Sequence, residues 1–188
     1  MLLYKYRGIQ AFKNLVDIFL NSRMYAAPYF DLNDPMEGHY IFNSNGFESE
    51  EMISFLKGEK EKIRILSLSR RPDISLMWAH YAEGNKGVAI GVELDDSRYN
   101  VRPVEYDGLL ELAPHNIHQD SAIDILSTKL SVWRYEEEVR VFITKGQYVN
   151  LSVKEVILGA RMSTQDKGFI KDLVGLLNMN IRVTSQRL

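Results

Sequence analysis

The chain has 188 residues, a formal net charge of −2 and no cysteine. A chain of this length can bury about 70% of its unfolded surface, so one domain over 1–188 is expected. The absence of thiols excludes disulfides, thiolate metal sites and a cysteine nucleophile, and the charge does not favour an electrostatic nucleic-acid binder.

The apolar stretches are too short to cross a bilayer, which takes about 20 residues. The first residues lack the pattern of a secretory signal peptide. We therefore expect a cytoplasmic protein with no membrane partner.

The first third of the chain contains two predicted strands and two predicted helices. Weak alternation predicts a strand at 2–6, and apolar residues at helical spacing predict a helix at 9–20. The segment 25–38 holds two prolines and a final glycine, which are typical of an ordered loop. A polar helix is predicted at 49–62, and clear period-two alternation predicts a strand at 63–69.

The middle of the chain continues this mixture of elements. A helix is predicted at 73–82, with Asp73 as its N-cap. Composition predicts strands at 87–94 and 101–106, and helical spacing of apolar residues predicts a helix at 119–130.

The last third of the chain contains further predicted strands at 138–143, 153–159 and 180–184. Ser163 and Asp166 fit a capping pattern that starts a final helix. Because the helices cluster rather than alternate regularly with the strands, the sequence predicts an α+β fold.

Three consecutive carboxylates, Glu136 to Glu138, stand at the start of the predicted strand 138–143. Successive side chains of a strand point to opposite faces, so Glu136, Glu138 and Arg140 are predicted to share one face. Two carboxylates in a cleft can divide acid and base duties, because each raises the pKa of the other. The alternative is an exposed edge whose charges are solvated.

Two other positions could take part in chemistry. On a helix, Met77, His80 and Tyr81 form one stripe, where histidine could transfer a proton and an aromatic ring could stack on a flat ligand. The alternative is a core histidine. Arg7, at the end of the first strand, could bind a phosphate bidentately, or could form a surface ion pair.

A metal site has little support in the sequence. His115 and His118 have ligand-like spacing on a predicted helix, with Asp120 and Asp124 nearby, but a third or fourth ligand is not evident. The chain has no P-loop pattern and no nucleophile elbow. We therefore predict no metal.

Several short blocks, taken together, resemble the bacterial domain-of-unknown-function 2971 family over about residues 3–160. The blocks are Leu-Tyr-Lys-Tyr-Arg at 3–7, Asn-Asp-Pro-Met-Glu at 33–37, Ser-Leu-Ser at 67–69, Leu-Met-Trp-Ala-His-Tyr-Ala at 76–82, Lys-Gly-Val at 86–88, Lys129, and Trp-x-Tyr-Glu-x-Glu-x-Arg at 133–140. The chain departs from the family at Leu32 and Met36, where phenylalanine is usual. The family name implies no activity, so the site must be derived from its residues.

The order Arg7, Ser67-x-Ser69, Glu136-x-Glu138 resembles the arginine–serine–glutamate signature of ADP-ribosyltransferases. This resemblance implies a split α+β fold, a twisted antiparallel or mixed β-sandwich with peripheral helices. It also implies cleavage of NAD, a small-molecule dinucleotide, at the nicotinamide–ribose bond. ADP-ribose would pass to an unknown acceptor, protein or nucleic acid, as in a toxin or a phage-defence effector.

The resemblance also assigns roles. The reaction passes through an oxocarbenium-like state, which Glu138 would stabilise while Glu136 orients or deprotonates the acceptor. Arg7 would hold the pyrophosphate, and Ser67 or Ser69 would position Glu138. The remaining expected site residues are His80 in catalysis and Asn33, Asp34, Trp78, Tyr81, Lys86, Trp133 and Arg140 in NAD binding, with Trp78 or Tyr81 stacking on nicotinamide.

Two alternatives belong to other functional classes. One is a metal-dependent phosphodiesterase or nuclease whose carboxylates hold Mg²⁺. Its site would comprise Asp34, His80, Lys86, Glu136 and Glu138. The other is a non-catalytic module with a ligand cleft lined by Trp78, Tyr81 and Trp133.

Overall fold

A computed structural model describes residues 1–10, 12–43, 49–95, 97–177 and 180–186. Its strands are β1 (Leu2–Arg7), β2 (Arg23–Tyr25), β3 (Ala27–Pro28), β4 (Tyr40–Phe42), β5 (Arg64–Ser69), β6 (Val88–Glu93), β7 (Asn100–Pro103), β8 (Leu110–Leu112), β9 (Glu138–Ile143), β10 (Tyr148–Asn150), β11 (Ser152–Leu158) and β12 (Arg182–Ser185). Its α-helices are α1 (Phe12–Asn21), α2 (Glu50–Glu61), α3 (Ser75–Tyr81), α4 (Ser121–Ile125) and α5 (Thr164–Leu177). Short 3₁₀ helices are η1 (Tyr29–Asp31), η2 (Pro114–Asn116) and η3 (Ser131–Glu136). The molecule is a mixed α+β fold, as predicted.

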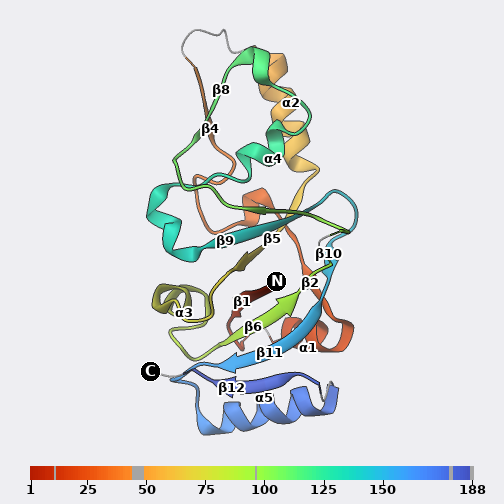
Figure 1. Cartoon of the computed structure of the whole chain (residues 1–188), viewed down its shortest axis with the longest axis vertical. Helices are drawn as coiled ribbons and strands as arrows, with labels where there is room; N and C mark the ends of the chain where they lie inside the picture. The colour runs from red at the N-terminus through yellow and green to blue at the C-terminus, as the bar shows by residue number, and fades with distance from the viewer. Residues whose placement is uncertain (11, 44–48, 96, 178–179, 187–188) are drawn as a thin grey trace.

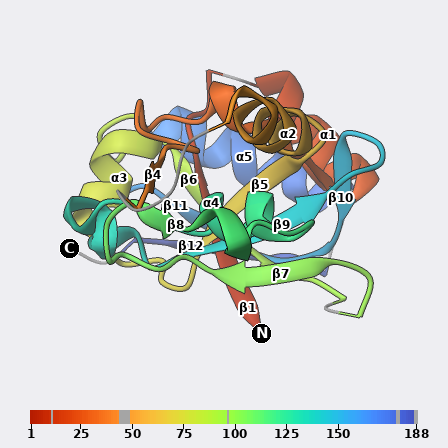
Figure 2. The ribbon, with the colours of Figure 1, turned by 90° about the horizontal axis from the view of Figure 1, so that it is seen from above.

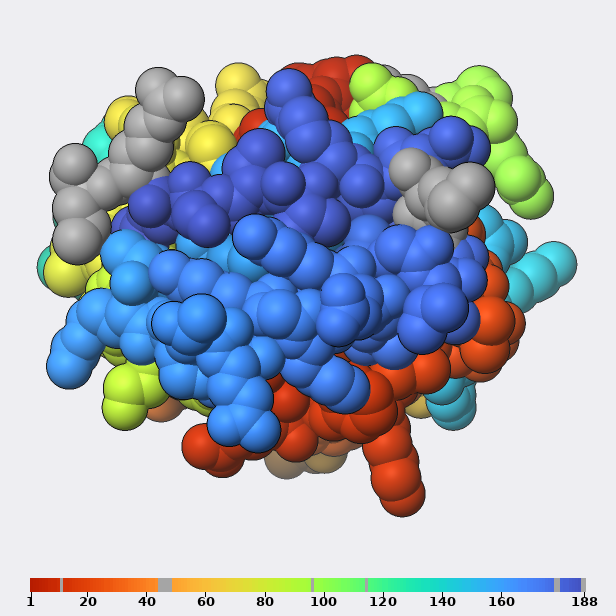
Figure 3. Space-filling model, turned by 90° about the horizontal axis from the view of Figure 1, so that it is seen from below, coloured from red at the N-terminus to blue at the C-terminus, as the bar shows by residue number. Residues whose placement is uncertain are grey.

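Most of the strands belong to one mixed sheet with the order β12-β11-β6-β1-β5-β9-β7, and β3 also pairs with β5. The β11–β12 pair is parallel, and the other pairs of this sheet are antiparallel. Figure 1 shows β4, β8, α2 and α4 at one end of the long axis and β12 and α5 at the other. Seen from that second end, α5 and the last strand cover most of the surface, with α1 at its margin (Figure 3).

The sheet is split between β1 and β5. All six residues of β1 pair with β6, but only Tyr4 pairs with β5, opposite Ser69. The strands diverge beyond this pair, and the Lys5 ammonium donates a hydrogen bond across the gap to the carbonyl oxygen of Ser67 (2.8 Å). The two parts of the sheet, β12-β11-β6-β1 and β5-β9-β7, are therefore joined in the ladder by one residue pair.

The main apolar core covers one face of this sheet. Alternate residues of β5, β6 and β9 point into it and meet α1 and α5. Representative members, all buried, are Leu15, Phe19, Leu66, Leu68, Ile90, Val139, Val141, Ile170 and Val174. Figure 2, viewed from above, shows α3 to one side of these helices, over the β1–β6 part of the sheet. The face opposite the main core is the one that carries polar side chains on β5 and β9.

Trp78 belongs to the packing beneath α3 and does not face a ligand site. Its ring is fully buried and lies edge-to-face against Tyr6, with 5.3 Å between ring centroids. Its Nε1–H donates to the carbonyl of Pro72 (2.7 Å), so the polar atom of the indole is satisfied internally. The predicted stacking of Trp78 on a ligand is therefore wrong. The predicted N-cap is wrong too, because the Asp73 carboxylate binds Arg71 and Ile74 takes the cap position.

The predicted helix 119–130 is wrong in its extent. Only Ser121–Ile125 is helical, because the chain after it pairs with Glu105: the Glu105 N–H donates to the carbonyl of Ser127, and the Glu105 carbonyl accepts from the N–H of Lys129. Tertiary pairing thus overrides the local helical preference. The short strands β2, β3, β4, β8 and β10 were not predicted, since two or three residues carry no periodic signal.

Gly87 is a position where the fold depends on the absence of a side chain. A Cβ there would overlap the carbonyl oxygen of Arg7 and lie 2.9 Å from Cα of Ala82. Both are backbone atoms, one at the end of β1 and the other in the turn that carries the chain from α3 into β6. We predict that Gly87→Ala lowers the free energy of unfolding by about 2 kcal/mol, as overpacking does.

Urea unfolding monitored by tryptophan fluorescence measures this change. The control is Gly168→Ala in the exposed surface of α5, where a Cβ meets nothing within 4 Å. This substitution should stabilise the protein by about 0.5–1 kcal/mol, because glycine is a poor helix former. Equal effects at the two sites would contradict the proposed clash.

Candidate functional site

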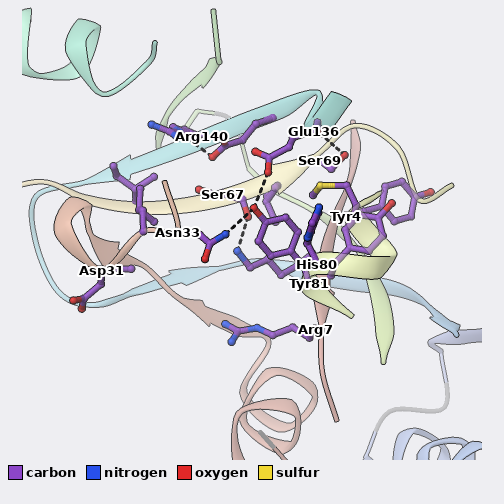
Figure 4. Close-up of a pocket in the computed structure, with 18 of the residues that line it drawn as sticks. Tyr4, Arg7, Asp31, Asn33, Ser67, Ser69, His80, Tyr81, Glu136 and Arg140 are labelled. Carbon is purple, nitrogen blue, oxygen red and sulfur yellow. Dashed lines mark hydrogen bonds and ion pairs between the residues drawn. The ribbon is translucent and has the colours of Figure 1, made fainter. Parts of the chain in front are cut away.

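A cavity of about 660 Å³ opens beside the split between β1 and β5. Figure 4 shows its walls: β1 on one side, β5 and the start of β9 on the other, with α3 and the loop after β3 beside them. The structure brings together most of the predicted site residues here. They are Arg7, Asn33, Ser67, Ser69, His80, Tyr81, Glu136, Glu138 and Arg140.

Glu136 and Glu138 meet, but not by sharing a strand face. Glu136 ends the 3₁₀ helix η3, Glu137 adopts a left-handed conformation with φ of +44°, and β9 starts at Glu138. The strand-face prediction is therefore wrong, and so is the solvated-edge alternative, since both side chains are nearly inaccessible. The Lys129 ammonium holds the pair together, at 2.6 Å from Glu136 Oε2 and 3.3 Å from Glu138 Oε2.

Arg140 extends this arrangement into a buried ion network. Its Nε donates to Glu138 Oε1 at 2.8 Å and its Nη2 to Glu37 Oε2 at 2.8 Å. A further bond from Nη1 reaches the carbonyl of Leu126 (2.7 Å). The side chain of Arg140 is 1% exposed, so each of its charges and donors must be satisfied by protein groups. Sequence reasoning missed Glu37 and Lys129, although both lie in the blocks that carry the family resemblance.

The network fixes the protonation of its members. Burial alone raises the pKa of Glu138, but Arg140 and Lys129 outweigh burial and lower this pKa to about 2. Burial lowers the pKa of Lys129, and the charges of Glu138 and Glu136 more than restore it, so it lies above its ordinary value. Glu138 and Lys129 are therefore both ionised at neutral pH.

Tyr81 links the network to the cavity wall. Its hydroxyl donates to Glu136 Oε1 (2.7 Å) and accepts from Asn33 Nδ2 (3.4 Å), as the dashed lines of Figure 4 show. Burial and the bond to Glu136 raise the pKa of the Tyr81 phenol, so it remains a donor at neutral pH. His80 lies beside it, with 6.2 Å between ring centroids. The two rings give one wall of the cavity an aromatic surface.

Two cations on β1 face the cavity without an anionic partner. Among the described residues, no carboxylate lies within ion-pair distance of Lys5 or Arg7, and the buried Nε of Arg7 has no hydrogen-bond acceptor. Burial, and then the positive charge of Arg7, lower the pKa of Lys5 to about 8. Lys5 was not predicted as a site residue. The available signal was its position two residues before Arg7, because residues two apart on a strand point to the same face.

The structure does not bring the remaining predicted binding residues, Asp34, Lys86 and Trp133, to this cavity. Asp34 is buried and its Oδ1 accepts from the N–H of Met36 (2.9 Å), which stabilises a turn. Lys86 is exposed. The Lys129 ammonium lies over the ring of Trp133, 4.8 Å from the ring centroid, so Trp133 contributes a cation–π contact to the network.

The predicted histidine pair does not form a metal site. His115 lies in η2 and His118 lies outside any helix, and His118 Nδ1 accepts from the N–H of Asp120 (3.2 Å). Across the described parts of the chain, no group of three or more His, Asp or Glu side chains is placed to hold a metal ion. The phosphodiesterase alternative also needs Asp34 and Lys86, which lie outside the cavity.

No protein-family model, no curated protein and no solved structure matches the chain. Both family resemblances therefore stay predictions. No helix within the described residues is long and apolar enough to cross a membrane.

The low pKa of Glu138 gives a test of the buried network. A group whose pKa falls from 4.5 to about 2 on folding adds stability above pH 4.5, and this stability is lost as the pH falls toward 2. We expect Glu138→Gln to lower the free energy of unfolding at pH 7 by up to about 3 kcal/mol. The difference in the free energy of unfolding between Glu138→Gln and the natural chain should shrink as the pH falls from 4.5 to 2.5, and urea unfolding at each pH measures it.

Glu137→Gln is the matched control. The Glu137 side chain is 40% exposed and pairs only with exposed Arg71, so its replacement should change stability by less than about 0.5 kcal/mol. A Glu138→Gln effect that does not vary between pH 7 and 2.5 would contradict the ionised, paired state of Glu138.

Proposed function

We propose that the chain binds NAD in this cavity, cleaves the nicotinamide–ribose bond and transfers ADP-ribose to an acceptor, in the manner of an ADP-ribosyltransferase. One observation carries the proposal. The split of the sheet places Arg7 on one side of a single cavity and Ser67, Ser69 and Glu138 on the other. The adjacent strands β1, β5 and β9 thus supply, in chain order, the three parts of the predicted signature.

The chemistry of these groups suits the reaction. Breaking the bond from ribose C1′ to nitrogen leaves the electron pair on nicotinamide and positive charge on the ribose. Glu138 stays ionised and cannot act as an acid, so its role is to stabilise this charge. The acceptor then bonds to C1′ and passes its proton to Glu136, whose Oε1 already accepts from Tyr81 and keeps a second lone pair.

The cavity also suits the ligand in size and lining. Its volume of about 660 Å³ lies in the range of small-molecule sites. Arg7 would hold the pyrophosphate, and the aromatic wall of His80 and Tyr81 would pack against the nicotinamide ring. Ser67 supports the reactive carboxylate, because its hydroxyl helps to lower the pKa of Glu138, after the larger effects of Arg140 and Lys129.

A non-catalytic binding module is the second candidate. It is favoured by the ion pairs in the cavity wall, in which Lys129 binds Glu136 and Glu138 and Arg140 binds Glu138. These cations cancel much of the negative charge that a cationic transition state requires. In this case the cavity would bind an anionic ligand and release it unchanged.

Incubation of the full chain with NAD labelled in the adenylate part, with and without cell lysate, separates the two candidates. The transferase should release nicotinamide and label a lysate component. Arg7→Gln should lower kcat/KM for NAD by about 10- to 100-fold, the usual effect of losing a charged ligand contact. This variant should fold normally, because the Nε of Arg7 has no partner to lose.

Arg161→Gln, which removes an exposed arginine outside the cavity, should leave nicotinamide release unchanged. Glu138→Gln should abolish release while retaining NAD binding by calorimetry. NAD binding without release by the natural chain would establish the binding module instead. The absence of both binding and release would overturn the transferase and exclude NAD as the ligand of a binding module.

A further inference from the structure

The position of Lys5 adds a second cation to the ligand site. Lys5 and Arg7 are two residues apart on β1, beyond the last pairing with β5, and both line the cavity. The Lys5 ammonium has three N–H donors, and one of them donates to the carbonyl of Ser67. Arg7 has a buried Nε–H without an acceptor. Donors of both side chains are therefore available to a ligand between the two parts of the sheet.

The buried carboxylates of the cavity and Glu83 are already engaged by other groups, and the further cavity carboxylate, Asp31, is exposed and within ion-pair distance of neither cation. Glu136 and Glu138 bind Lys129 and Arg140. The carboxylate of Glu83 lies beside Gly8, directly after the end of β1, and accepts from the backbone N–H groups of Ile9 and Gln10, at 3.3 Å each. Two neighbouring cations that are largely removed from water and lack an anion raise the free energy of the empty site, so an anionic ligand would be bound favourably.

We infer that Lys5 and Arg7 together bind a doubly charged phosphate group, and that Lys5 must carry its proton to do so. The inference rests on the proposed function in taking that group to be the pyrophosphate of NAD or ADP-ribose. It goes beyond that function in naming Lys5 as a specificity residue and in coupling binding to a proton. An uncharged nucleoside would gain nothing from this pair.

The proton coupling follows from the charges around Lys5. Burial and Arg7 hold its pKa near 8, while the glutamates of the network raise it less. A bound dianion would raise this pKa. The affinity for the dianion is therefore close to its maximum at pH 7 and falls as the pH rises through 8. Because binding requires the proton on Lys5, a pKa near 8 gives about a tenfold fall in affinity between pH 7 and pH 9. Other charged and titratable groups line this cavity. Those nearest in charge effect to Lys5 are Arg7, Lys129, Glu136 and Glu138, and the rest are Asp31, Glu37, His80, Glu83, Arg140 and the tyrosines at 4, 6, 25 and 81.

Calorimetric titration of the full chain with ADP-ribose at pH 7 and pH 9 tests the inference. The pyrophosphate of ADP-ribose is a diester and keeps two charges over this range, so the ligand contributes no proton of its own. We expect ADP-ribose to bind, adenosine not to bind, and the affinity for ADP-ribose to fall about tenfold between the two pH values.

Three variants identify the residue responsible. Lys5→Arg keeps the charge without titrating, so it should bind ADP-ribose equally at both pH values. Lys5→Met should bind at least tenfold more weakly at pH 7, without a further fall at pH 9. His80→Gln should keep the pH dependence of the natural chain. Thermal unfolding of each variant checks the fold, and Lys5→Arg remains informative if Lys5→Met does not fold.

Each outcome decides the inference. A fall in affinity that persists in Lys5→Arg, or disappears in His80→Gln, would overturn the role of Lys5. Equal binding of adenosine would overturn the dianion site. If NAD is cleaved but ADP-ribose affinity does not vary with pH, the subsite fails and the transferase stands. If ADP-ribose binds with the expected pH dependence but NAD is never cleaved, the subsite stands and the transferase fails.

Discussion

The arrangement of the site depends on one buried guanidinium. The side chain of Arg140, in the middle of β9, is almost fully buried and binds Glu138 on its own strand and Glu37 from a distant loop. The attraction offsets the cost of removing these charges from water only because the geometry is bidentate and the spare donor finds the carbonyl of Leu126. This contact fastens the loop that follows β3 and thereby sets the position of Asn33 at the cavity.

From Arg140 the interactions continue through alternating charges to the surface of the cavity. Glu138, Lys129 and Glu136 follow in turn, and the Tyr81 hydroxyl ends the series. The opposite face of the sheet is covered by apolar side chains in contact with α1 and α5. The two faces thus differ. One is stabilised by burial of hydrocarbon throughout, whereas the other combines apolar packing, as around Trp78, with directional contacts that hold the side chains of the site in defined positions.

The sequence predicted the longer strands and the residue types of the site, because both have local signatures. Alternation located β5, and an apolar run after the glutamates located β9. The proximity of Glu136 and Glu138 followed from their spacing, although for the wrong geometric reason. The partners of these glutamates could not be predicted in this way. Glu37 lies 103 residues from Arg140 along the chain, and no local pattern specifies that the two meet.

Other errors have the same physical origin. Trp78 was expected at a ligand because aromatic rings serve both binding and packing, and only the presence of Tyr6 and the Pro72 carbonyl beside it decides between them. The helix predicted at 119–130 ends early because Glu105 competes for the backbone groups of its last residues. Lys5 was not predicted because its role depends on the lack of a neighbouring carboxylate in the folded chain, and the sequence does not show which side chains become neighbours.

The single residue pair that joins β1 to β5 has a mechanical consequence. A change in the angle between the two parts of the sheet would disturb few ladder hydrogen bonds, since Tyr4 and Ser69 form the one ladder pair between β1 and β5, both of which the structure describes in full. Such a rotation would alter the separation of Arg7 from Glu138, which lie on opposite sides of this joint. A molecule long enough to touch both sides would fix the angle, whereas a fragment bound to one side alone would leave the joint free to move.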